Sequence, residues 1–493
     1  MIPDYGTLPE MIRGQADRNG DETFLIRAET GETFSYQEID ARSDEVAATL
    51  AERGVVAGDK VGVILPNSAA LVVAICGVLK VGGVVVPTNP EYKTGEIAYV
   101  FEQSDSQLVI TEESLRKTVE KAIDDIGVKA LLTPEECEAN ANESRSTVPK
   151  REVRPVDTAL LMFTSGTTGD PKSVALSHLN LLFRFDGGEM PRGYGVFYTV
   201  LPLFNIDGFI TTLGTMYDGG QVLLRNGFSA SSFWADVEQY DANITSVVPS
   251  VLAILLEREY PENRDVSSFE RFVVSGSYVH EELVERFEEA FGINVMEIYG
   301  LTEAAGTAYE SPEEVVVGSA GSPTLYAEAA ILDEDTSEPL PPGELGEIVL
   351  RGPTVFKEYY NNPEATEEVL QGGWFHTEDI GYVDKEGRCY VKDRIKNIII
   401  RGGQNIYPGE IEEAIHAHPA VEDVAVVGHE HEIYGEVPVA YVTIDEHTDE
   451  KALEKRIRED CTERFADFKI PEAVYILEEF PRGETGKILK ERL

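Results

Sequence analysis

Short runs of aliphatic residues alternate with amphipathic stretches along the first half of the chain. Residues 61–65 and 84–86 have the composition of buried strands, and the apolar segment 69–79 between them predicts a helix. Ser35 and Glu38 form a capping box that predicts the start of another helix. Alternation of this kind is typical of mostly parallel sheets covered by helices, so we expect an α/β fold.

The same alternation returns further along the chain. Five more buried strands are expected there, at 196–201, 221–224, 244–248, 272–275 and 295–298. Strands that are apolar throughout are buried on both faces, which again favours parallel sheets between layers of helices.

The pattern changes near residue 395, after a basic stretch. Beyond it we expect two strands and a charged helix, at 424–427, 437–444 and 449–465. A tail of this length is large enough for a domain of its own. We therefore expect a large domain of helix-covered mixed sheets at 1–395 and a small α+β domain at 396–493.

Composition indicates a globular protein with more than one core. The chain has 493 residues, of which 42% are hydrophobic and 27% charged, and single cores rarely grow beyond roughly 250 to 300 residues. No apolar run reaches the roughly 20 residues of a membrane span, and the N-terminus lacks the pattern of a signal peptide. The four cysteines are far apart without zinc or redox spacing, so we expect a cytoplasmic protein with reduced cysteines.

The chain is strongly acidic. It carries 42 Lys and Arg against 89 Asp and Glu, a formal net charge of −47. Nucleic acid requires a basic footprint and is therefore excluded as a partner. The acidic residues are spread along the whole chain, and at low salt their mutual repulsion opposes folding. We therefore hypothesise a halophilic host with a high-salt cytoplasm.

A phosphate-binding loop is expected directly after the apolar strand at 159–163. Backbone N–H and hydroxyl groups of such a loop can surround phosphate oxygens, and a lysine adds positive charge. The spacing differs from the Walker pattern, because Gly166 and Gly169 are too close and Pro171 precedes the lysine. A plain surface turn is the alternative for this segment taken alone. The expected phosphate ligands are Thr164, Ser165, Gly166, Thr167, Thr168, Gly169 and Lys172.

The loop sequence T-S-G-T-T-G-x-P-K resembles the phosphate-binding signature of the adenylate-forming superfamily. This superfamily includes acyl-CoA synthetases, luciferases and the adenylation domains of peptide synthetases. Further segments are similar to the family's motifs and follow in its order, at 299–303, 374–379, 393–396, 403–412 and 481–488. The resemblance runs from Phe34 to Lys490 and implies that the small C-terminal domain is mobile.

The resemblance implies an ATP-dependent, AMP-forming ligase that activates a carboxylic acid as its adenylate and passes the acyl group to coenzyme A. Negative charge grows on the α-phosphate in the first step, so cations and oriented donors must lie there. Lys487 and Thr302 are the expected catalytic groups, together with Glu303. Glu303 is also the expected Mg²⁺ ligand, because a hard carboxylate suits a hard cation, and Thr164 is expected to share the ion.

The same resemblance implies the groups that bind the nucleoside. Tyr299 and Gly300 are expected beside the adenine, and Asp379 is expected to accept hydrogen bonds from both ribose hydroxyls. Arg394 is the second expected ribose contact. Glu378 stands where the family has a glycine before the aspartate.

The acyl pocket departs from the family's pattern. Its expected wall contains Asn205, Asp207, Ser277 and Tyr278, and Asn205 replaces the usual histidine. These residues imply a pocket that is more polar or shorter than a plain fatty-acid tunnel.

Two further positions are implied for the thiol transfer. Lys396 matches the family's hinge, and Gly403 matches the glycine beside the incoming pantetheine of coenzyme A.

Several functions are consistent with these motifs. An acyl-CoA synthetase of fatty acid metabolism is the leading hypothesis, and a stand-alone enzyme that loads a carrier protein or a luciferase-like oxygenase are the enzymatic alternatives. A nucleotide-binding sensor is the alternative without catalysis. Retention of Lys487, Glu303 and Lys172 together argues against a sensor, which needs no transition-state groups. The histidine pairs at 416/418 and 429/431 lack helical metal-ligand spacing, so we interpret them as surface residues.

Overall fold

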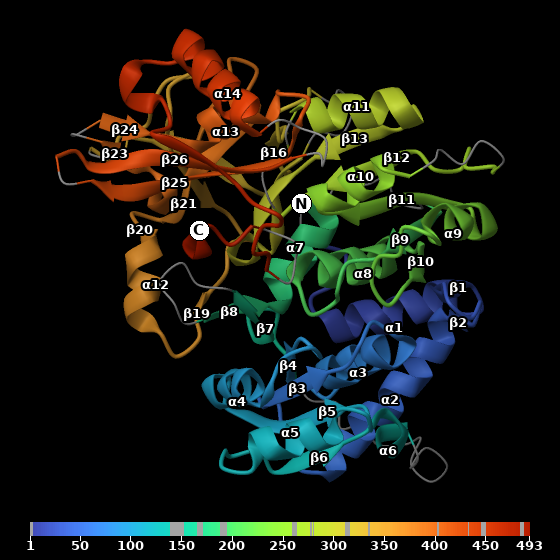
Figure 1. Cartoon of the computed structure of the whole chain (residues 1–493). Helices are drawn as coiled ribbons and strands as arrows, with labels where there is room; N and C mark the ends of the chain where they lie inside the picture. Colours follow the sequence, from blue (N-terminus) through green and yellow to red (C-terminus); the bar gives the residue numbers. More distant parts are fainter. Residues whose placement is uncertain are drawn as a thin grey trace.

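The computed structural model describes residues 3–138, 152–164, 171–187, 195–258, 264–276, 279, 281–310, 316–333, 336–401, 404–431, 433–444, 450–483 and 488–493. Within these ranges the strands form five sheets, two of them with seven strands. In Figure 1 the two seven-stranded sheets lie one above the other, and the C-terminal sheet forms a separate group with its own helices. The α/β architecture agrees with the fold class expected from the sequence.

The first large sheet contains the five expected strands after residue 195. Its strands lie in the order β13 (Asn294–Glu297), β12 (Arg271–Val274), β11 (Ala242–Val247), β9 (Val196–Thr199), β10 (Gln221–Leu224), β1 (Thr23–Arg27) and β2 (Thr33–Ser35). All neighbours pair in parallel except β1 and β2, which form an antiparallel pair. The helices α8 (Ile206–Asp218), α9 (Phe233–Tyr240), α10 (Pro249–Leu256) and α11 (Glu281–Phe291) connect these strands.

The second large sheet is mixed. Its strands lie in the order β19 (Glu358–Tyr359), β8 (Lys172–Ser177), β7 (Thr158–Thr164), β4 (Val84–Pro87), β3 (Lys60–Ile64), β5 (Ser106–Thr111) and β6 (Ala130–Leu132). From β7 to β6 the strands are parallel, whereas β8 and β19 run antiparallel to their neighbours. The expected phosphate loop therefore joins β7 to β8 as an antiparallel connection.

The N-terminal helices pack on these sheets. They are α1 (Leu8–Asn19), α2 (Tyr36–Glu52), α3 (Ala69–Lys80), α4 (Thr94–Gln103), α5 (Arg116–Ile123), α6 (Pro134–Glu138) and α7 (His178–Gly187). The capping box of Ser35 and Glu38 opens α2 as expected. Nearly every residue of α3 is buried. A helix that is apolar on all sides is stable only where other elements cover every side of it. The hydrophobic cluster that contains α3 also includes residues of both large sheets, so α3 lies between these sheets (Figure 1).

Two smaller sheets follow in the chain. One contains β14 (Tyr299–Leu301), β15 (Gly306–Glu310) and β16 (Ser322–Pro323); the other contains β17 (Glu328–Leu332), β18 (Gly346–Arg351), β21 (Trp374–Val383), β20 (Leu370–Gln371) and β22 (Cys389–Arg394). Helix α12 (Pro363–Val369) and the short 3₁₀ turn η1 (Thr302–Ala304) accompany them. All neighbours in these two sheets pair antiparallel.

The C-terminal segment has a sheet and a core of its own. The sheet contains β24 (Gln404–Ile406), β23 (Ile399–Arg401), β26 (Gly435–Ile444), β25 (Val421–His431) and β27 (Ala473–Ile476). Residues of α13 (Pro408–His416) and α14 (Glu450–Arg464) pack on it, and this cluster begins at Ile399. The 3₁₀ turn η2 (Ile395–Asn397) precedes it, and η3 (Asp467–Lys469) and η4 (Lys490–Arg492) lie near the end. No helix among the described residues combines the length and the apolar character that a membrane crossing requires.

Candidate active site

The expected site residues lie where parallel strands end. Thr164 is the last residue of β7, and Ser275 follows the end of β12. Residues 200–205 follow β9, and η1 follows β13 and β14. β9, β12 and β13 are parallel strands of the first large sheet, so their carboxyl ends lie on the same edge, whereas β7 belongs to the second large sheet. This edge is where open α/β sheets bind ligands.

Three of the expected nucleoside contacts form one cluster. The hydroxyl of Tyr299 donates a hydrogen bond to Oδ2 of Asp379 at 2.6 Å, and Nε of Arg394 lies 2.9 Å from Oδ1 of the same carboxylate. Asp379 is only 4% exposed. Burial and the neighbouring carboxylate raise the pKa of Tyr299 well above its usual value, so its hydroxyl remains a donor. Both carboxylate oxygens are therefore oriented before any ligand binds.

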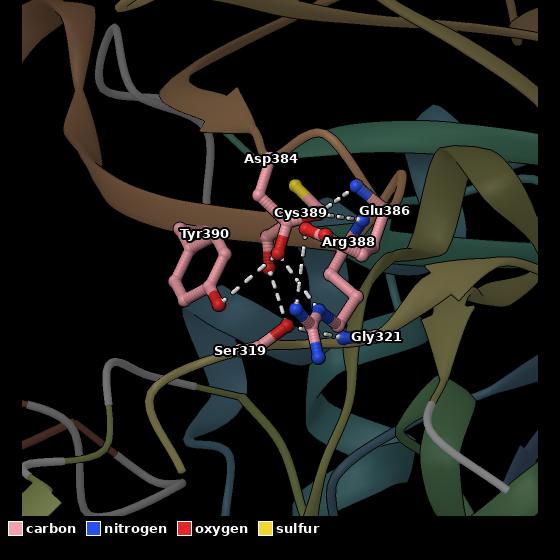
Figure 2. Close-up of polar contacts among 7 residues, drawn as sticks. All are labelled: Ser319, Gly321, Asp384, Glu386, Arg388, Cys389 and Tyr390. Atoms are coloured by element: carbon pink, nitrogen blue, oxygen red, sulfur yellow. Dashed lines mark hydrogen bonds and ion pairs between the residues drawn. The ribbon is translucent and has the colours of Figure 1, made fainter. Parts of the chain in front are cut away.

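The strand pair β21–β22 fixes this geometry. Asp379 and Arg394 lie directly opposite each other in the antiparallel register. At the far end of the pair, Asp384 accepts hydrogen bonds from the backbone and side chain of Arg388, at 2.9 and 2.7 Å (Figure 2). Ser319 Oγ donates to the carbonyl of Cys389 at 3.2 Å (Figure 2). These contacts hold the turn, and an irregularity in the register between Ile380 and Gly381 separates the turn from the Asp379–Arg394 pair.

A second cluster surrounds Glu303 in η1. The hydroxyl of Tyr359 donates to Oε1 of Glu303 at 2.9 Å, and Nζ of Lys172 lies 5.0 Å from the centroid of the Tyr359 ring. Burial raises the pKa of the Glu303 carboxyl, while the Tyr359 hydroxyl opposes that shift. Thr164 and Lys172 are paired across the β7–β8 connection. The other expected phosphate ligands, at 165–169, lie outside the described residues.

The carboxylate oxygens of Glu303 are suitable ligands for a divalent cation such as Mg²⁺. Mg²⁺ is usually bound by one or two carboxylates together with substrate phosphates. A carboxylate has about four lone-pair sites, so Glu303 can bind a cation while Tyr359 holds one of its oxygens. Within the described ranges, no group of three or more His, Cys, Asp or Glu is arranged to hold a metal ion.

The expected acyl-pocket wall is built from the start of α8 and the end of β12. Asn205 is the N-cap residue of α8, and the hydroxyl of Ser275 donates to Oδ2 of Asp207 at 2.8 Å. Burial raises the pKa of Asp207, and both Ser275 and the charge of Arg184 oppose that shift. Ser277 and Tyr278 lie outside the described residues. The described part of this wall is polar.

Asn67 connects this wall to the second large sheet. Its Nδ2 donates to the carbonyls of Leu201 and Arg225 at 2.9 and 3.1 Å. Its Oδ1 accepts from the backbone N–H of Leu203 at 3.0 Å. One amide therefore satisfies two backbone groups of the segment that leads into α8 and one directly after β10. Sequence reasoning missed Asn67, Ser275 and Tyr359, because these contacts join residues that are far apart in the chain.

The expected hinge lies in the short turn η2, which contains Lys396. Asp393, three residues before Lys396, is hydrogen-bonded to the segment that follows it. Its Oδ2 accepts from the backbone N–H of Gly409 at 3.0 Å, and its Oδ1 accepts from Asn397 Nδ2 at 2.8 Å. A Cβ on Gly409 would lie 2.4 Å from the carbonyl oxygen of Lys392, so glycine is required for this close approach. Gly403 and Lys487 lie outside the described residues.

Family models and curated relatives match nearly the whole chain. The AMP-binding enzyme family matches residues 12–360, and the AMP-binding enzyme C-terminal domain matches residues 410–487. The chain is 32% identical to the sulfoacetate–CoA ligase of Cupriavidus necator, over 99% of this chain and 97% of that protein. It is also 32% identical to the 2-succinylbenzoate–CoA ligase of Geobacillus kaustophilus, over 99% and 97% of the two chains.

Solved structures agree with the sequence relatives. The structure of the o-succinylbenzoate coenzyme A synthetase from Bacillus subtilis, in complex with ATP and magnesium ion, has a TM-score of 0.85 and 31% identity, covering 98% of this chain and 99% of that chain. ATP-bound MatB from Rhodopseudomonas palustris has a TM-score of 0.90 at 27% identity, with 98% of each chain covered. These likenesses extend over the whole chain, including its C-terminal sheet.

Proposed function

This chain belongs to the AMP-binding enzyme family and is an AMP-forming acyl-CoA synthetase, and we propose that the clusters around Asp379 and Glu303 carry out its first half-reaction. In that step a carboxylate oxygen of the acid attacks the α-phosphorus of ATP and pyrophosphate leaves. Coenzyme A then attacks the acyl-adenylate, which gives acyl-CoA and releases AMP. The relatives, all CoA ligases, favour coenzyme A as acceptor over a carrier protein.

The observation that carries the residue assignments is the oriented carboxylate of Asp379. With Tyr299 on one oxygen and Arg394 on the other, it can accept hydrogen bonds from the ribose hydroxyls in a fixed direction. Tyr299 and Gly300 would border the adenine. Such preordering lowers the conformational entropy lost on binding.

The phosphates are assigned to the groups around η1. Thr302, Lys172 and the loop from Thr164 would contact them, and Glu303 with Thr164 would hold the Mg²⁺. When bound, the ion neutralises charge on the phosphates and stabilises the leaving pyrophosphate. Lys487 is assigned to the charge that develops on the α-phosphate.

The acid is proposed to carry a polar group or a short chain. Asp207 and Ser275 form a hydrogen-bonded polar wall beside Asn205, and a long apolar chain would leave these groups without compensation. The polar wall therefore favours polar or short acids over long-chain fatty acids as substrates. Ser277 and Tyr278 are assigned to the same wall.

The second half-reaction is proposed to use a rotated C-terminal domain. Lys487 and Gly403 belong to one small domain yet serve different steps, and a rigid domain could not bring both to the same acyl group. Rotation about Lys396 in η2 would exchange them, because hinges absorb large backbone changes in few residues. Lys392, Asp393 and Gly409, which hold this boundary, would change partners during the rotation.

Two lysine variants provide a reciprocal test of this proposal. Lys487→Ala is expected to lower acid-dependent exchange of pyrophosphate into ATP by about 10²-fold or more, since an electrostatic transition-state contact is lost. Its conversion of preformed acyl-adenylate to acyl-CoA should remain. Lys396→Pro fixes φ near −65° and should retain exchange while thioester formation falls. Each variant is the control for the other.

Both half-reactions should be measured with a panel of small polar, branched, aromatic and long-chain acids. If the two variants lose both activities by the same factor, the assigned roles of Lys487 and Lys396 are wrong. If the unaltered protein catalyses exchange with none of the acids, the assignment of the first half-reaction to the clusters around Asp379 and Glu303 loses its support.

A further inference from the structure

Tyr359 lies between two groups that are assigned to the phosphates. It is 5% exposed and belongs to β19 at the edge of the second large sheet. Its hydroxyl donates to Oε1 of Glu303 at 2.9 Å, and its ring lies under the ammonium of Lys172 at 5.0 Å. One side chain therefore contacts both the expected metal ligand and the expected phosphate lysine.

The surrounding structure holds this side chain in place. Tyr359 pairs with Val174 of β8, two residues after Lys172, so the sheet register sets the distance between ring and lysine. The backbone N–H of Tyr359 donates to Thr366 Oγ1 at 3.0 Å. Its ring packs on Phe356 at a centroid distance of 4.8 Å, and the N–H of Phe356 donates to the carbonyl of Glu303 at 2.7 Å. The same short segment thus fixes the ring and the backbone of Glu303.

We propose that Tyr359 is a positioning residue for the adenylation step, on the basis of the proposed function. Its hydroxyl holds Oε1 of Glu303, so that the other oxygen would be available to a divalent cation bound with the ATP phosphates. Its ring holds the ammonium of Lys172 by a cation–π contact. A glutamate that is already ordered loses less rotamer entropy when the cation binds, so the affinity for the cation rises.

The neighbouring Tyr360 provides a matched control. Its hydroxyl donates to Oδ2 of Asp105 at 3.0 Å, and Nζ of Lys60 lies 4.6 Å from its ring centroid. The two tyrosines therefore make the same kinds of contact with an acid and a lysine, at adjacent positions of one segment. Only the contacts of Tyr359 involve groups assigned to the nucleotide.

The test compares Tyr359→Phe with Tyr360→Phe in the full-length protein. Two quantities are measured: the Mg²⁺ concentration that gives half-maximal pyrophosphate exchange, and the binding of Mn²⁺ in the presence of a non-hydrolysable ATP analogue, detected by electron paramagnetic resonance. Tyr359→Phe is expected to weaken both by about tenfold, equivalent to about 1.4 kcal/mol. Tyr360→Phe should match the parent in both. Tyr359→Leu should also raise the KM for ATP, because the cation–π contact between Lys172 and the aromatic ring is then lost.

The outcomes separate this inference from the function itself. If the parent catalyses exchange and Tyr359→Phe requires no more Mg²⁺ than the parent, Tyr359 does not position Glu303. The same conclusion follows if Tyr359→Phe lowers only the melting temperature, or if both phenylalanine variants weaken Mn²⁺ binding equally. Absence of exchange in the parent would contradict the proposed function.

Discussion

Glu378 has a backbone conformation that glycine adopts more readily. Its φ is +59°, in the left-handed region, and its N–H donates to Oε1 of Glu347 at 3.1 Å. The residue immediately precedes Asp379 at the centre of the nucleoside cluster. The left-handed conformation turns the chain so that Asp379 can face Arg394, which explains why a glycine would serve at this position in related sequences.

Replacing this glutamate tests how much strain the site contains. Glu378→Gly is expected to raise the free energy of unfolding by about 1 kcal/mol relative to Glu378→Ala, because alanine keeps the left-handed penalty and glycine does not. Unfolding in urea measures the difference. Both variants remove the same carboxylate, so charge cancels in the comparison. Equal stability of the two would mean that the strain relieved at 378 is no larger than the free energy lost through the greater unfolded-state entropy of glycine.

Single residues differ in how well the sequence predicts them. Tyr299, Asp379 and Arg394 belong to short motifs, and the structure brings the three side chains into direct contact. Tyr359 and Asn67 carry no such signal. Their partners are 56 and more than 130 residues away, and nothing in the local pattern of a lone tyrosine or asparagine indicates which backbone or carboxylate it will meet.

At the scale of elements, the parallel strands were the most predictable. The expected strands of the first large sheet agree with β9 to β13 within about two residues at each end, a usual uncertainty for strand boundaries, since strands buried on both faces are continuously apolar. The antiparallel sheet of β17, β18 and β21 was not predicted. The ten residues of β21 include His376, Thr377, Glu378 and Asp379, and these polar residues interrupt the apolar pattern of the strand.

Glu297 lies at the end of β13, where three elements meet. Its carboxylate accepts from the N–H of Gly318 at 3.0 Å, and it is near Glu281 of α11 and Lys392 of β22. Burial, reinforced by the charge of Glu281, raises the pKa of Glu297 to about 7, although Gly318 and Lys392 oppose the shift. The carboxyl is therefore protonated in the folded state over a range where it ionises in the unfolded chain.

This pKa shift predicts a pH-dependent stability. Between pH 4.5, the ordinary pKa of a glutamate, and about 7 the folded state binds the extra proton, so the contribution of Glu297 is present at low pH and is lost as the pH rises through 7. Glu297→Gln keeps an acceptor for Gly318 but does not titrate. The stability of this variant relative to the parent should therefore rise by about 1 to 3 kcal/mol from acidic to alkaline pH.

Urea unfolding of both proteins across that pH range gives this difference directly, and the pH dependence common to all other carboxyls cancels. A constant difference between variant and parent would mean that Glu297 has the same pKa in the folded and unfolded states.

At the scale of the whole molecule, acidic charge is the dominant feature. The 89 acidic residues exceed the 42 basic ones by 47, and this formal surplus of negative charge remains at neutral pH however the ion pairs are arranged. Buried ion pairs such as Lys80 with Asp40 and Asp44 use some of the few cations inside the fold. Such pairs leave the excess of negative charge unchanged, and compaction brings the surface carboxylates together.

This surplus predicts that salt stabilises the folded state. The Debye length falls from about 10 Å at 0.1 M to about 3 Å at 1 M salt, so repulsion between surface carboxylates is screened. The unfolding midpoint is expected to rise by about 5 °C or more between dilute buffer and molar KCl, which corresponds to roughly 5 kcal/mol if a chain of this size unfolds as one unit. Sucrose, which is excluded from protein surfaces but carries no charge, is the control for preferential exclusion. A rise with KCl alone identifies screening, and a protein suited to a high-salt cytoplasm should show it. If stability is greatest in dilute buffer, the acidic surface does not destabilise the fold, and the proposal of a halophilic host loses its physical basis.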